Sequence, residues 1–459
     1  MNALPSRDFS PVYLPDQIRA AEAPLLAAVG SKLMHEAAYA VALEAKKLLR
    51  QHRKMPYGAR ILVLAGRGNN AGDALIAAAE LEKSGATVYV WLTAETTHEQ
   101  ALAMIKYPKL VQDVPKNIDL VLDGIVGIGA RGGLDGEPAR AVAAVAGLPV
   151  LAVDLPSGVD PVTGHCHGAH ISAERTVTFG GLKPAHVRGW EHCGEVKVHG
   201  LGIDKHLGKP FAWEVRKPSA WPYPGPNDNK YTTGVVGIRA GSAQYPGAAV
   251  LAVHGAVNAT SAMVRYVGPC ARGVTTAHPE VVACESMAAA GKVQAWVYGP
   301  GVGVDKQELL EMLERPEPLV LDADAITTLA ASQSCIAAMC ERDAVTVLTP
   351  HGGEFARITT AQTAQQLAQE LGICVLLKGR VTEVAYGDEL YLIEAGSSWA
   401  ATPGSGDVLA GVIGAAIAWE PSAEMVANAV RMHADAATLC GGPVPASDIA
   451  RALSQVVRP

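Results

Sequence analysis

Runs of apolar, β-forming residues alternate with helical stretches through the first half of this chain, and no other feature restricts its fold as strongly. The helical stretches are 16–51, interrupted once at Gly30, and 74–84; the strand-like runs are 60–65, 87–92, 118–123 and 149–154. These runs are apolar at consecutive positions, which is typical of strands buried on both faces. The pattern predicts a parallel sheet with helices on both sides and ligand-binding turns at the carboxyl ends of its strands.

A proline-rich segment separates this series from a second one. Residues 217–228 carry four prolines and no apolar periodicity, so they are interpreted as a linker. Strand-like runs resume at 233–238, 293–298, 319–322, 345–348 and 373–377. At 459 residues, the chain is long enough for two domains. The predicted organisation is an N-terminal domain over 1–216, a linker over 217–229 and a C-terminal domain over 230–459.

The composition argues against several classes of partner. Lys and Arg number 38 against 45 Asp and Glu, a formal net charge of −7 that indicates neither a nucleic-acid nor a membrane partner. The stretch from Met1 to Gln17 lacks the features of a signal peptide, and no apolar run is long enough to cross a membrane. Among eight cysteines, the one close pair, Cys335 and Cys340, fits no zinc or redox motif. Reduced thiols in a cytoplasmic protein are therefore expected.

The turn Gly404-Ser-Gly-Asp407 precedes an apolar helix that is predicted over 408–419. Glycine lacks a Cβ atom, so the turn can present bare backbone N–H groups beside the positive end of the helix dipole. Such a turn binds anions, and phosphate is the anion expected there. Because a carboxylate would repel phosphate, Asp407 is interpreted as the base for a hydroxyl that attacks the phosphate. The alternative is that Asp407 is only a helix N-cap.

A second glycine-rich turn, Gly66-Arg-Gly-Asn-Asn-Ala-Gly-Asp73, directly follows the first strand. It has the position of a phosphate or dinucleotide site, although it lacks the third glycine of the Rossmann fingerprint. Later strand ends add Asp123 and the segment Asp154-Leu-Pro-Ser157. Asn70, Asp123 and Ser157 all supply oxygen, so they can meet around one hard, weakly bound cation. Each also has an ordinary interpretation as a turn or cap residue.

The strand ends of the second series should line one cleft in the same way. Lys378 and the Gly379 N–H group are placed to face a nucleotide phosphate, with Gly406 continuing the anion site. Asp322, Asp324 and Glu354 can hold magnesium, directly or through water. His351 can contact a second, organic ligand. The alternatives are that Asp324 caps the following helix and that Glu354 is a solvated acid in a first helical turn.

The N-terminal motifs together resemble the epimerase half of the bifunctional NAD(P)H-hydrate repair enzyme family. The match continues with Thr178-Phe-Gly180 and Lys183-Pro184, whereas Ala71 and Ala74 stand where the family usually has glycine. The resemblance implies a Rossmann-like three-layer α/β/α sandwich, potassium at Asn70, Asp123 and Ser157, and catalytic roles for Asp154 and Lys183. It places the hydrated nucleotide on Asn69, Asn70, Ala71, Gly72, Asp73, Gly127, Ile128, Gly129, Ala130, Arg131, Gly132, Gly133 and Asp154.

The C-terminal motifs resemble the other half of that family, the ADP-dependent dehydratase, which has a ribokinase-like α/β fold. The matching segments are Lys230-Tyr-Thr-Thr-Gly234, Tyr245-Pro-Gly-Ala248, Gly299-Pro-Gly-Val-Gly303, Asp322-Ala-Asp324, Thr349-Pro-His351 with Glu354, Leu377-Lys-Gly379 and Gly404-Ser-Gly-Asp407. The resemblance makes Asp407 catalytic and places the hydrated substrate on Ala248, Gly301, Gly303, His351 and Asp407. It places the adenine nucleotide on Lys378, Gly379, Arg380, Val381, Thr382 and Gly406.

The resemblance implies a bifunctional enzyme. One site would interconvert the R and S forms of hydrated NADH and NADPH, and the other would dehydrate the S form with ADP as co-substrate, giving NAD(P)H, AMP and phosphate. Potassium would serve the first site and magnesium the second, in a homo-oligomer of four or more chains. Two alternatives stay open: a ribokinase-like kinase for a small vitamin alcohol with an N-terminal nucleotide-binding domain, and a binding or scaffold protein without catalysis.

The triplet His165-Cys166-His167 has the residue types of a metal site. It lies in a glycine-containing loop, and no distant partner has a matching spacing. The sequence therefore predicts no metal at this triplet.

Overall fold

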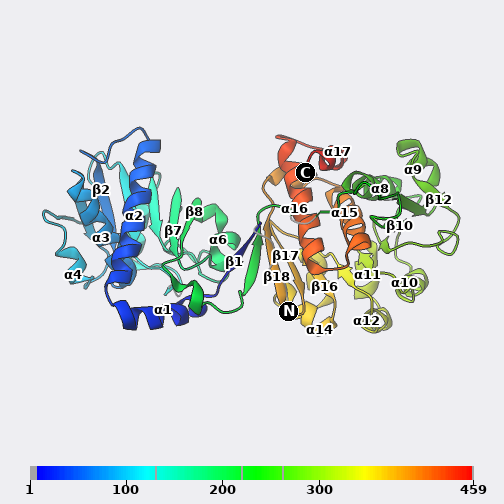
Figure 1. Cartoon of the computed structure of the whole chain (residues 1–459), viewed down its shortest axis with the longest axis horizontal. Coiled ribbons are helices and arrows are strands. Elements are labelled where there is room, and N and C mark those ends of the chain that lie inside the picture. Colours follow the sequence, from blue (N-terminus) through cyan, green and yellow to red (C-terminus); the bar gives the residue numbers. More distant parts are fainter. Residues whose placement is uncertain (1–7, 130–131, 219–220, 261–262, 457–459) are drawn as a thin grey trace. The chain divides into compact units, whose positions relative to one another are not determined.

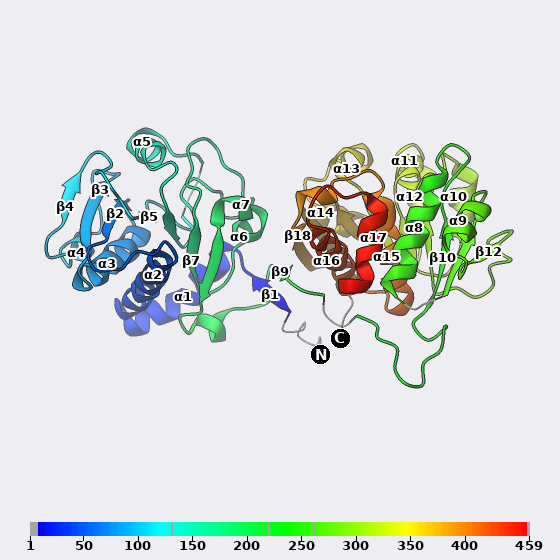
Figure 2. The ribbon, with the colours of Figure 1, turned by 90° about the horizontal axis from the view of Figure 1, so that it is seen from above.

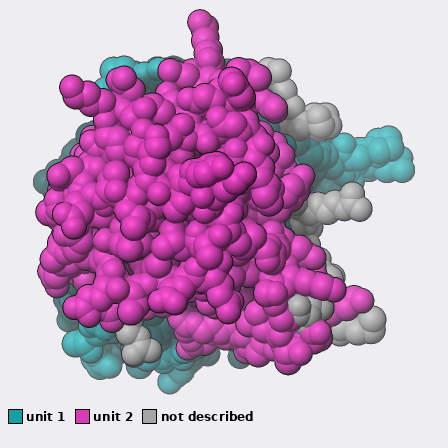
Figure 3. Space-filling view, turned by 90° about the vertical axis from the view of Figure 1, so that its left-hand side faces the viewer, with its two compact units in different colours: residues 1–10, 213–459 teal, residues 11–212 magenta. Residues whose placement is uncertain are grey.

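The computed structural model describes residues 8–129, 132–218, 221–260 and 263–456. These residues form two compact units, coloured separately in Figure 3. The N-terminal unit comprises residues 11–212, and the C-terminal unit comprises residues from Trp213 on together with those up to Ser10. No helix in the described part of the chain is both long enough and apolar enough to span a bilayer.

The N-terminal unit is built on a sheet of seven strands, all of them parallel (Figure 1). The strand order is β4-β3-β2-β5-β6-β7-β8. The chain adds β3 and β4 on one side of β2, and then β5 to β8 on the other side. In chain order the strands are β2 (Arg60–Ala65), β3 (Thr87–Leu92), β4 (Lys109–Val111), β5 (Leu120–Gly124), β6 (Val150–Val153), β7 (Arg175–Phe179) and β8 (Glu195–His199).

Helices cover both faces of this sheet (Figure 2). On one face, α2 (Lys32–Gln51) and α3 (Asn69–Lys83) pack against strand residues such as Val63 and Leu122. On the other, α5 (Gly136–Ala144) packs against the alternate residues, such as Leu62 and Val121. The predicted three-layer arrangement is therefore confirmed. The remaining elements are α1 (Pro15–Val29), α4 (Glu99–Leu102), α6 (Pro184–Arg188), α7 (Trp190–Cys193) and a 3-10 turn η1 (Ile203–His206).

Helix α3 begins at Asn69, five residues before the start predicted from the sequence at Ala74. Gly68 is its N-cap, so the segment from Asn69 to Asp73 forms the first helical turn and not a loop. The N–H groups of a first turn have no partners within the helix, and they therefore point out of its end toward the carboxyl edge of the sheet.

The C-terminal unit contains a sheet of eleven strands, ordered β1-β9-β18-β17-β16-β15-β14-β13-β10-β11-β12. Strands from β16 through β12 are parallel to one another, whereas β17 is antiparallel to both of its neighbours, β16 and β18. The strands are β1 (Phe9–Val12), β9 (Ala212–Val215), β10 (Val235–Arg239), β11 (Met263–Val267), β12 (Val282–Cys284), β13 (Ala295–Tyr298), β14 (Leu319–Leu321), β15 (Thr346–Leu348), β16 (Cys374–Leu377), β17 (Val381–Tyr386) and β18 (Glu389–Glu394).

Helices also cover both faces of the second sheet (Figures 1 and 2). One group shares the largest apolar core with the strands: α8 (Pro246–Ala259), α15 (Ser405–Trp419), α16 (Ala423–Leu439) and α17 (Ala446–Val456). The other group contains α10 (Lys306–Leu313), α11 (Asp324–Ala330), α12 (Gln333–Cys340), α13 (Gly352–Ile358) and α14 (Ala364–Leu371). Helix α9 (Ala271–Ala277) and the 3-10 turn η2 (Ser398–Ala400) complete the unit. The α/β class predicted for both halves is confirmed.

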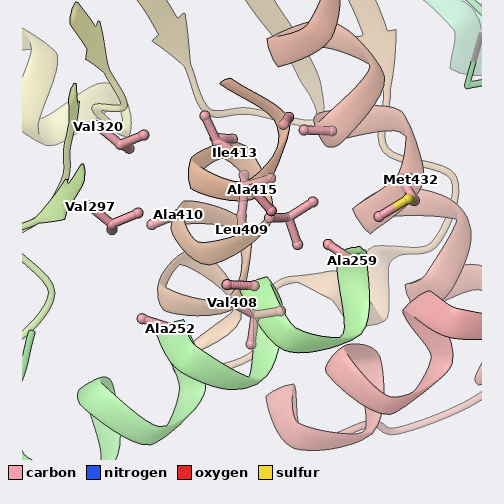
Figure 4. Packing of buried hydrophobic residues seen from close by; sticks show 14 of the residues in the cluster. Ala252, Ala259, Val297, Val320, Val408, Leu409, Ala410, Ile413, Ala415 and Met432 are labelled. Carbon is pink, nitrogen blue, oxygen red and sulfur yellow. The ribbon is translucent and has the colours of Figure 1, made fainter. Parts of the chain in front are cut away.

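Two glycines allow α8 and α15 to pack with their backbones in direct contact (Figure 4). A Cβ atom added at Gly255 of α8 would lie 2.1 Å from the Val408 carbonyl oxygen, and one added at Gly411 of α15 would lie 1.9 Å from the Ala252 carbonyl oxygen. Both separations are far below van der Waals contact, so any larger residue would force the helices apart. This contact fixes the position of the first turn of α15, where Asp407 lies.

The chain passes between the units inside β1 and β9. Phe9 lies in the core of the C-terminal unit, with its ring 5.8 Å from that of Tyr391 in an edge-on contact. Trp221, within the segment expected to be a linker, is also buried in that core and donates its indole N–H to the Ala259 carbonyl at 2.8 Å. The proposed domain boundaries at 216 and 230 thus lie on the C-terminal side of the division between compact units.

Replacing Gly411 by alanine should destabilise the C-terminal unit by about 1–3 kcal/mol, because the added methyl group overlaps the Ala252 carbonyl. Gly247→Ala is the matched control, because Gly247 also lies in a helix, α8, and its added Cβ would meet no atom within 4 Å. Urea unfolding should show the loss for Gly411→Ala alone. Equal stability of the two variants would contradict the packing argument.

Candidate active sites

A cavity of about 880 Å³ lies at the carboxyl edge of the N-terminal sheet. Its walls come from the segments that follow β2, β3, β5, β6 and β7, together with one face of α1. Of the residues predicted to bind the hydrated nucleotide, those that line it are Asn69, Asn70, Asp73, Gly127, Ile128, Gly129, Gly132, Gly133 and Asp154; Lys183 lines it too. Ala130 and Arg131 lie outside the described residues.

Ala71 and Gly72 turn away from this cavity. Ala71 and Ala74 are fully buried in the core between α3 and the sheet, and a Cβ added at Gly72 would meet the side chains of His98 and Met34. The sequence suggested that the methyl groups of Ala71 and Ala74 lie where the backbone approaches the ligand. The structure corrects this expectation, because both methyl groups pack behind the wall of the cavity.

Asp154 and Lys183 form a buried ion pair in the cavity wall, with 2.6 Å between Nζ and Oδ1. Lys183 also donates to the Thr178 hydroxyl at 2.7 Å and to the Phe179 carbonyl at 2.8 Å, so its three N–H groups are all used. The Ile128 N–H group donates to the other carboxylate oxygen of Asp154. Asp154 has φ of +66°, a left-handed conformation that is costly for a non-glycine residue and often found at functional sites.

His186 holds this pair from behind. Its Nδ1 accepts from the Lys183 backbone N–H at 2.9 Å, and its Nε2 therefore donates to the Asp154 backbone carbonyl, also at 2.9 Å. Burial, followed by the nearby Lys183 ammonium, lowers the pKa of His186 to about 4, so the ring is neutral at pH 7. Burial alone would raise the pKa of Asp154, but the Lys183 ammonium outweighs it, and the pKa is lowered overall.

Two further acids face the ion pair. Burial raises the pKa of Asp73 well above its usual value, and the negative charges of Asp154 and Glu22 raise it further. Burial also raises the pKa of Glu22, with Lys183 opposing the shift and Asp154 adding to it. Sequence reasoning missed Glu22. Its one signal is helical spacing: Ile18, Arg19, Glu22, Ala23 and Leu26 line the cavity from one face of α1.

The three residues predicted to hold potassium lie at neighbouring strand ends. Asp123 is fully buried and accepts hydrogen bonds from the Ser157 N–H at 2.8 Å and from the Ser157 hydroxyl at 2.6 Å. Burial raises the pKa of Asp123 to about 6. Asn70 packs with its backbone carbonyl against Gly124, and its buried Nδ2 has no hydrogen-bond partner among the described residues. The Nδ2 group is a donor and cannot bind a cation, whereas the oxygens of the Asn70, Asp123 and Ser157 side chains can. A buried acid whose hydrogen-bond donors are all neutral fits a weakly held cation.

In the C-terminal unit, the strand ends bring Asp322 and Lys378 together. The Lys378 ammonium donates to Asp322 Oδ1 at 2.8 Å, and the Thr349 hydroxyl donates to the same oxygen at 2.7 Å. Burial alone would lower the pKa of Lys378, but Asp322 outweighs it and the pKa is raised, so the ammonium stays charged. An always-charged lysine at the end of β16 is suited to neutralise a phosphate.

Asp407 lies in the first turn of α15, which begins at Ser405, three residues before the start predicted from the sequence. Gly404, the N-cap, has φ of +83°, which glycine adopts without strain. A Cβ added at Gly406 would lie 3.5 Å from the Lys378 Nζ atom, so the bare backbone of the turn faces the ammonium. Burial raises the pKa of Asp407 to about 7; Asp322 and Asp324 add to the shift and Lys378 opposes it. The N-cap interpretation of Asp407 does not apply, because the cap is Gly404.

The expected substrate residues of this unit lie on neighbouring turns. A Cβ added at Gly301 would meet the side chains of Ala248 and Tyr245 within 3 Å. The Gly303 N–H group donates to Asp324 Oδ2 at 2.9 Å. His351 is exposed and caps α13 by accepting from the N–H groups of the next turn. These contacts bring Ala248 next to Gly301 and place Gly303 beside Asp324.

The expected nucleotide residues follow β16 as a turn and the first part of β17. Gly379 is exposed, and Thr382 is buried with its hydroxyl donating to the Gly379 carbonyl at 3.3 Å. Arg380 pairs with Glu394 at 2.6 Å and donates to the Gly396 carbonyl. Val381, which begins β17, is half-buried. Sequence reasoning missed His433, whose buried Nε2 atom lies 3.2 Å from the Ser405 hydroxyl beneath the turn.

The three acids expected to hold magnesium use only some of their carboxylate oxygens in hydrogen bonds within the protein. Asp322 uses Oδ1 for Lys378 and Thr349, and Asp324 uses Oδ2 for the Gly303 N–H. Glu354 accepts from the His351 N–H in a capping box, so it is not a solvated acid as one alternative held. Asp322 and Asp324 lie close enough to raise the pKa of Asp407. This concentration of negative charge around one ammonium fits a divalent cation bound with a nucleotide.

Comparison with known proteins agrees with the two sites. Residues 236–452 match the family described as NAD(P)H-hydrate dehydratase, and residues 30–185 match the YjeF-related protein N-terminus. A bifunctional NAD(P)H-hydrate repair enzyme of Mycobacterium tuberculosis is 46% identical over 424 residues, which cover 88% of this chain and 89% of that protein. The chain belongs to the family of bifunctional NAD(P)H-hydrate repair enzymes.

Other members of this repair-enzyme family are similar over most of their length. That of Mycobacterium leprae is 43% identical over 459 residues, covering 96% of each chain. Among solved structures, an ADP/ATP-dependent NAD(P)H-hydrate dehydratase from Bacillus subtilis is 26% identical and covers 51% of this chain and 92% of its own, with a TM-score of 0.45.

Proposed function

We propose that this chain repairs hydrated NADH and NADPH in two steps. The N-terminal unit interconverts the R and S epimers at C6, and the C-terminal unit dehydrates the S epimer at the expense of ADP. The observation that carries the proposal is Asp407: its pKa is raised to about 7, and it lies next to Gly406, whose backbone faces the Lys378 ammonium. A base of that pKa beside an anion site suits phosphoryl transfer to a hydroxyl at neutral pH.

The epimerase step rests on Asp154. Its carboxylate has a lowered pKa, lines the cavity and is fixed by Lys183. It can carry a proton from the C6 hydroxyl to the ring nitrogen as the bond between C6 and that nitrogen opens to an aldehyde, and return the proton to the oxygen as the bond closes on the other face of C6. The Lys183 ammonium keeps the carboxylate charged and oriented. Burial raises the pKa values of Asp73 and Glu22, whose carboxyl groups face the substrate in the same cavity.

The dehydration step begins with transfer of the terminal phosphoryl group of ADP. Asp407 takes the proton from the C6 hydroxyl as its oxygen attacks the phosphorus, and AMP leaves. The ring nitrogen lone pair then expels phosphate from C6, and the neighbouring ring carbon loses a proton to restore the double bond. The products are NAD(P)H, AMP and phosphate. Lys378 and the N–H groups at the start of α15 hold the charge of the transferring group.

Two cations complete the proposal. Magnesium, held by Asp322, Asp324 and Glu354 directly or through water, would neutralise the phosphates of the nucleotide. Potassium, held by Asn70, Asp123 and Ser157, would fix the strand ends that form the first cavity. The eight cysteines are all free thiols, which supports a reducing, cytoplasmic location. Assembly into four or more chains stays a prediction.

The function of the two units can be separated with purified epimers. Wild-type enzyme with ADP should restore nicotinamide absorbance from both R and S hydrate. Asp154→Asn should lose use of R hydrate beyond its spontaneous epimerisation, because the ionised base is removed, while use of S hydrate continues unchanged. Undiminished consumption of R hydrate by this variant would refute the proposed role of the N-terminal unit.

Asp407→Asn should lower the rate of S-hydrate dehydration at least 100-fold, because asparagine keeps the size of the side chain and removes the base. Calorimetric binding of ADP is the control and should be nearly unchanged. In the wild type, kcat/KM should fall tenfold per pH unit below about pH 7 as Asp407 takes up a proton. Asp324→Asn should move this inflection to lower pH, because one negative neighbour is lost. Comparable turnover by Asp407→Asn would exclude it as the base.

Replacing potassium by lithium should slow epimerisation several-fold, because the smaller ion fits poorly between the carboxylate of Asp123 and the hydroxyl of Ser157. Dehydration of pure S hydrate by the same preparation is the internal control and should be unaffected. An equal loss of both activities would place the cation effect outside this site.

A further inference from the structure

Three side chains with metal-binding atoms converge in the N-terminal unit, away from the acids and lysine described above. The Cys166 thiol and the His170 and His192 rings each offer one ligand atom, and these atoms lie within 4.8 Å of one another. Cys166 and His170 belong to the segment between β6 and β7, whereas His192 lies in α7. All three are partly buried.

The hydrogen bonds of both rings leave the appropriate nitrogen unprotonated. His170 Nδ1 donates to the Gly168 carbonyl at 2.9 Å, so Nε2 keeps its lone pair. His192 Nε2 lies 3.3 Å from the Glu191 carboxylate, which favours a proton on that nitrogen. His192 Nδ1 is then an acceptor, and it is buried without a hydrogen-bond partner in the described part of the chain. A carbonyl and a carboxylate behind the two rings are the usual outer partners of metal-bound histidines.

The two rings also lie close together. Their centroids are 4.6 Å apart with an interplanar angle of 67°, which is an edge-to-face contact. This contact stabilises the pair without an ion, and a shared cation would in addition use both ring lone pairs and the sulfur.

A disulfide with Cys193, the residue after His192, is the competing use of Cys166. The Cys193 sulfur, however, is fully buried and lies 3.6 Å from the Ala185 carbonyl of α6, to which it donates. The Cys193 thiol thus already has a hydrogen-bond partner, whereas the Cys166 thiol lies beside two histidines. This arrangement favours metal binding by Cys166 over a disulfide.

We propose that Cys166, His170 and His192 bind one zinc ion, with a water molecule as the fourth ligand. One thiolate and two imidazoles are the ligand types that zinc selects, and three protein ligands with an open position are a known zinc arrangement. This proposal departs from the sequence analysis, which predicted no metal at His165-Cys166-His167. Cys166 of that triplet takes part, and the distant partner is His192, which no spacing rule connects to it.

The site would stiffen one wall of the first cavity. A Cβ added at Gly158 would lie 2.4 Å from the Ala169 carbonyl oxygen, and one added at Gly133 would lie 2.0 Å from that of His167. The Ile171 N–H group donates to the Ser157 carbonyl at 2.8 Å. The segment 167–171 therefore packs directly behind Gly133, Ser157 and Gly158. Zinc would link this segment to α7. Its role would be to position the wall, since no ligand touches the reacting atoms.

Cobalt provides the direct test, because a thiolate-bound cobalt ion gives an intense near-ultraviolet charge-transfer band and a tetrahedral site gives strong visible bands. The full chain, with any affinity tag removed and metal stripped by a chelator, should bind one equivalent of Co²⁺ with both signals. Added Zn²⁺ should displace it. Cys166→Ser should lose the charge-transfer band, and His170→Gln should bind at least tenfold more weakly.

Cys340→Ser is the matched control, since Cys340 is an exposed thiol outside the cluster, and it should bind cobalt as the wild type does. Dehydration of S hydrate verifies that the C-terminal unit of each variant is folded. Circular dichroism verifies the fold of the whole chain. If Cys166→Ser does not fold, His170→Gln decides alone. Less than one equivalent bound in the wild type, or unchanged spectra in Cys166→Ser, would overturn the proposal.

Discussion

A buried lysine–aspartate ion pair holds each of the two sites together. Lys183 pairs with Asp154 in one unit and Lys378 with Asp322 in the other, and each pair lies at the carboxyl ends of parallel strands. Removing two charges from water costs several kcal/mol, which only good geometry and further hydrogen bonds offset. Thr178 and Thr349 supply those bonds. The surrounding turns are therefore constrained to the conformations that keep both partners satisfied.

The two ion pairs also divide the neighbouring acids by the direction of their pKa shifts. The ammonium next to Asp154 outweighs burial and lowers the pKa of that carboxyl group, whereas burial raises the pKa values of Asp73 and Glu22. In the second site Lys378 pairs with Asp322, and burial raises the pKa of Asp407 to about 7. Each site thus pairs one carboxylate with an ammonium and leaves others with raised pKa values, a division that suits proton-transfer chemistry.

Sequence alone located the strands that it named to within two residues, because runs such as Ile61 to Ala65 are apolar at every position. It placed the starts of α3 and α15 too late, since glycine-rich first turns have the composition of loops. It did not predict β1, β4, β7, β8, β9, β11, β12, β17 or β18; of these, β1 and β9 have only four residues each. Glu22 and His192 escaped because their roles depend on tertiary contacts between segments far apart in the sequence, and no local pattern encodes such contacts.

The placement of β1 affects how the chain can fold during synthesis. The residues of β1 leave the ribosome before the N-terminal unit, yet its sheet neighbour β9, and β18 beyond it, are made much later. The N-terminal unit can bury its core as soon as β8 has emerged, while Phe9 must wait, exposed, for Tyr391. Closing a loop of this length costs conformational entropy and is therefore slow. The addition of β1 to the C-terminal sheet is thus the last step in forming that sheet.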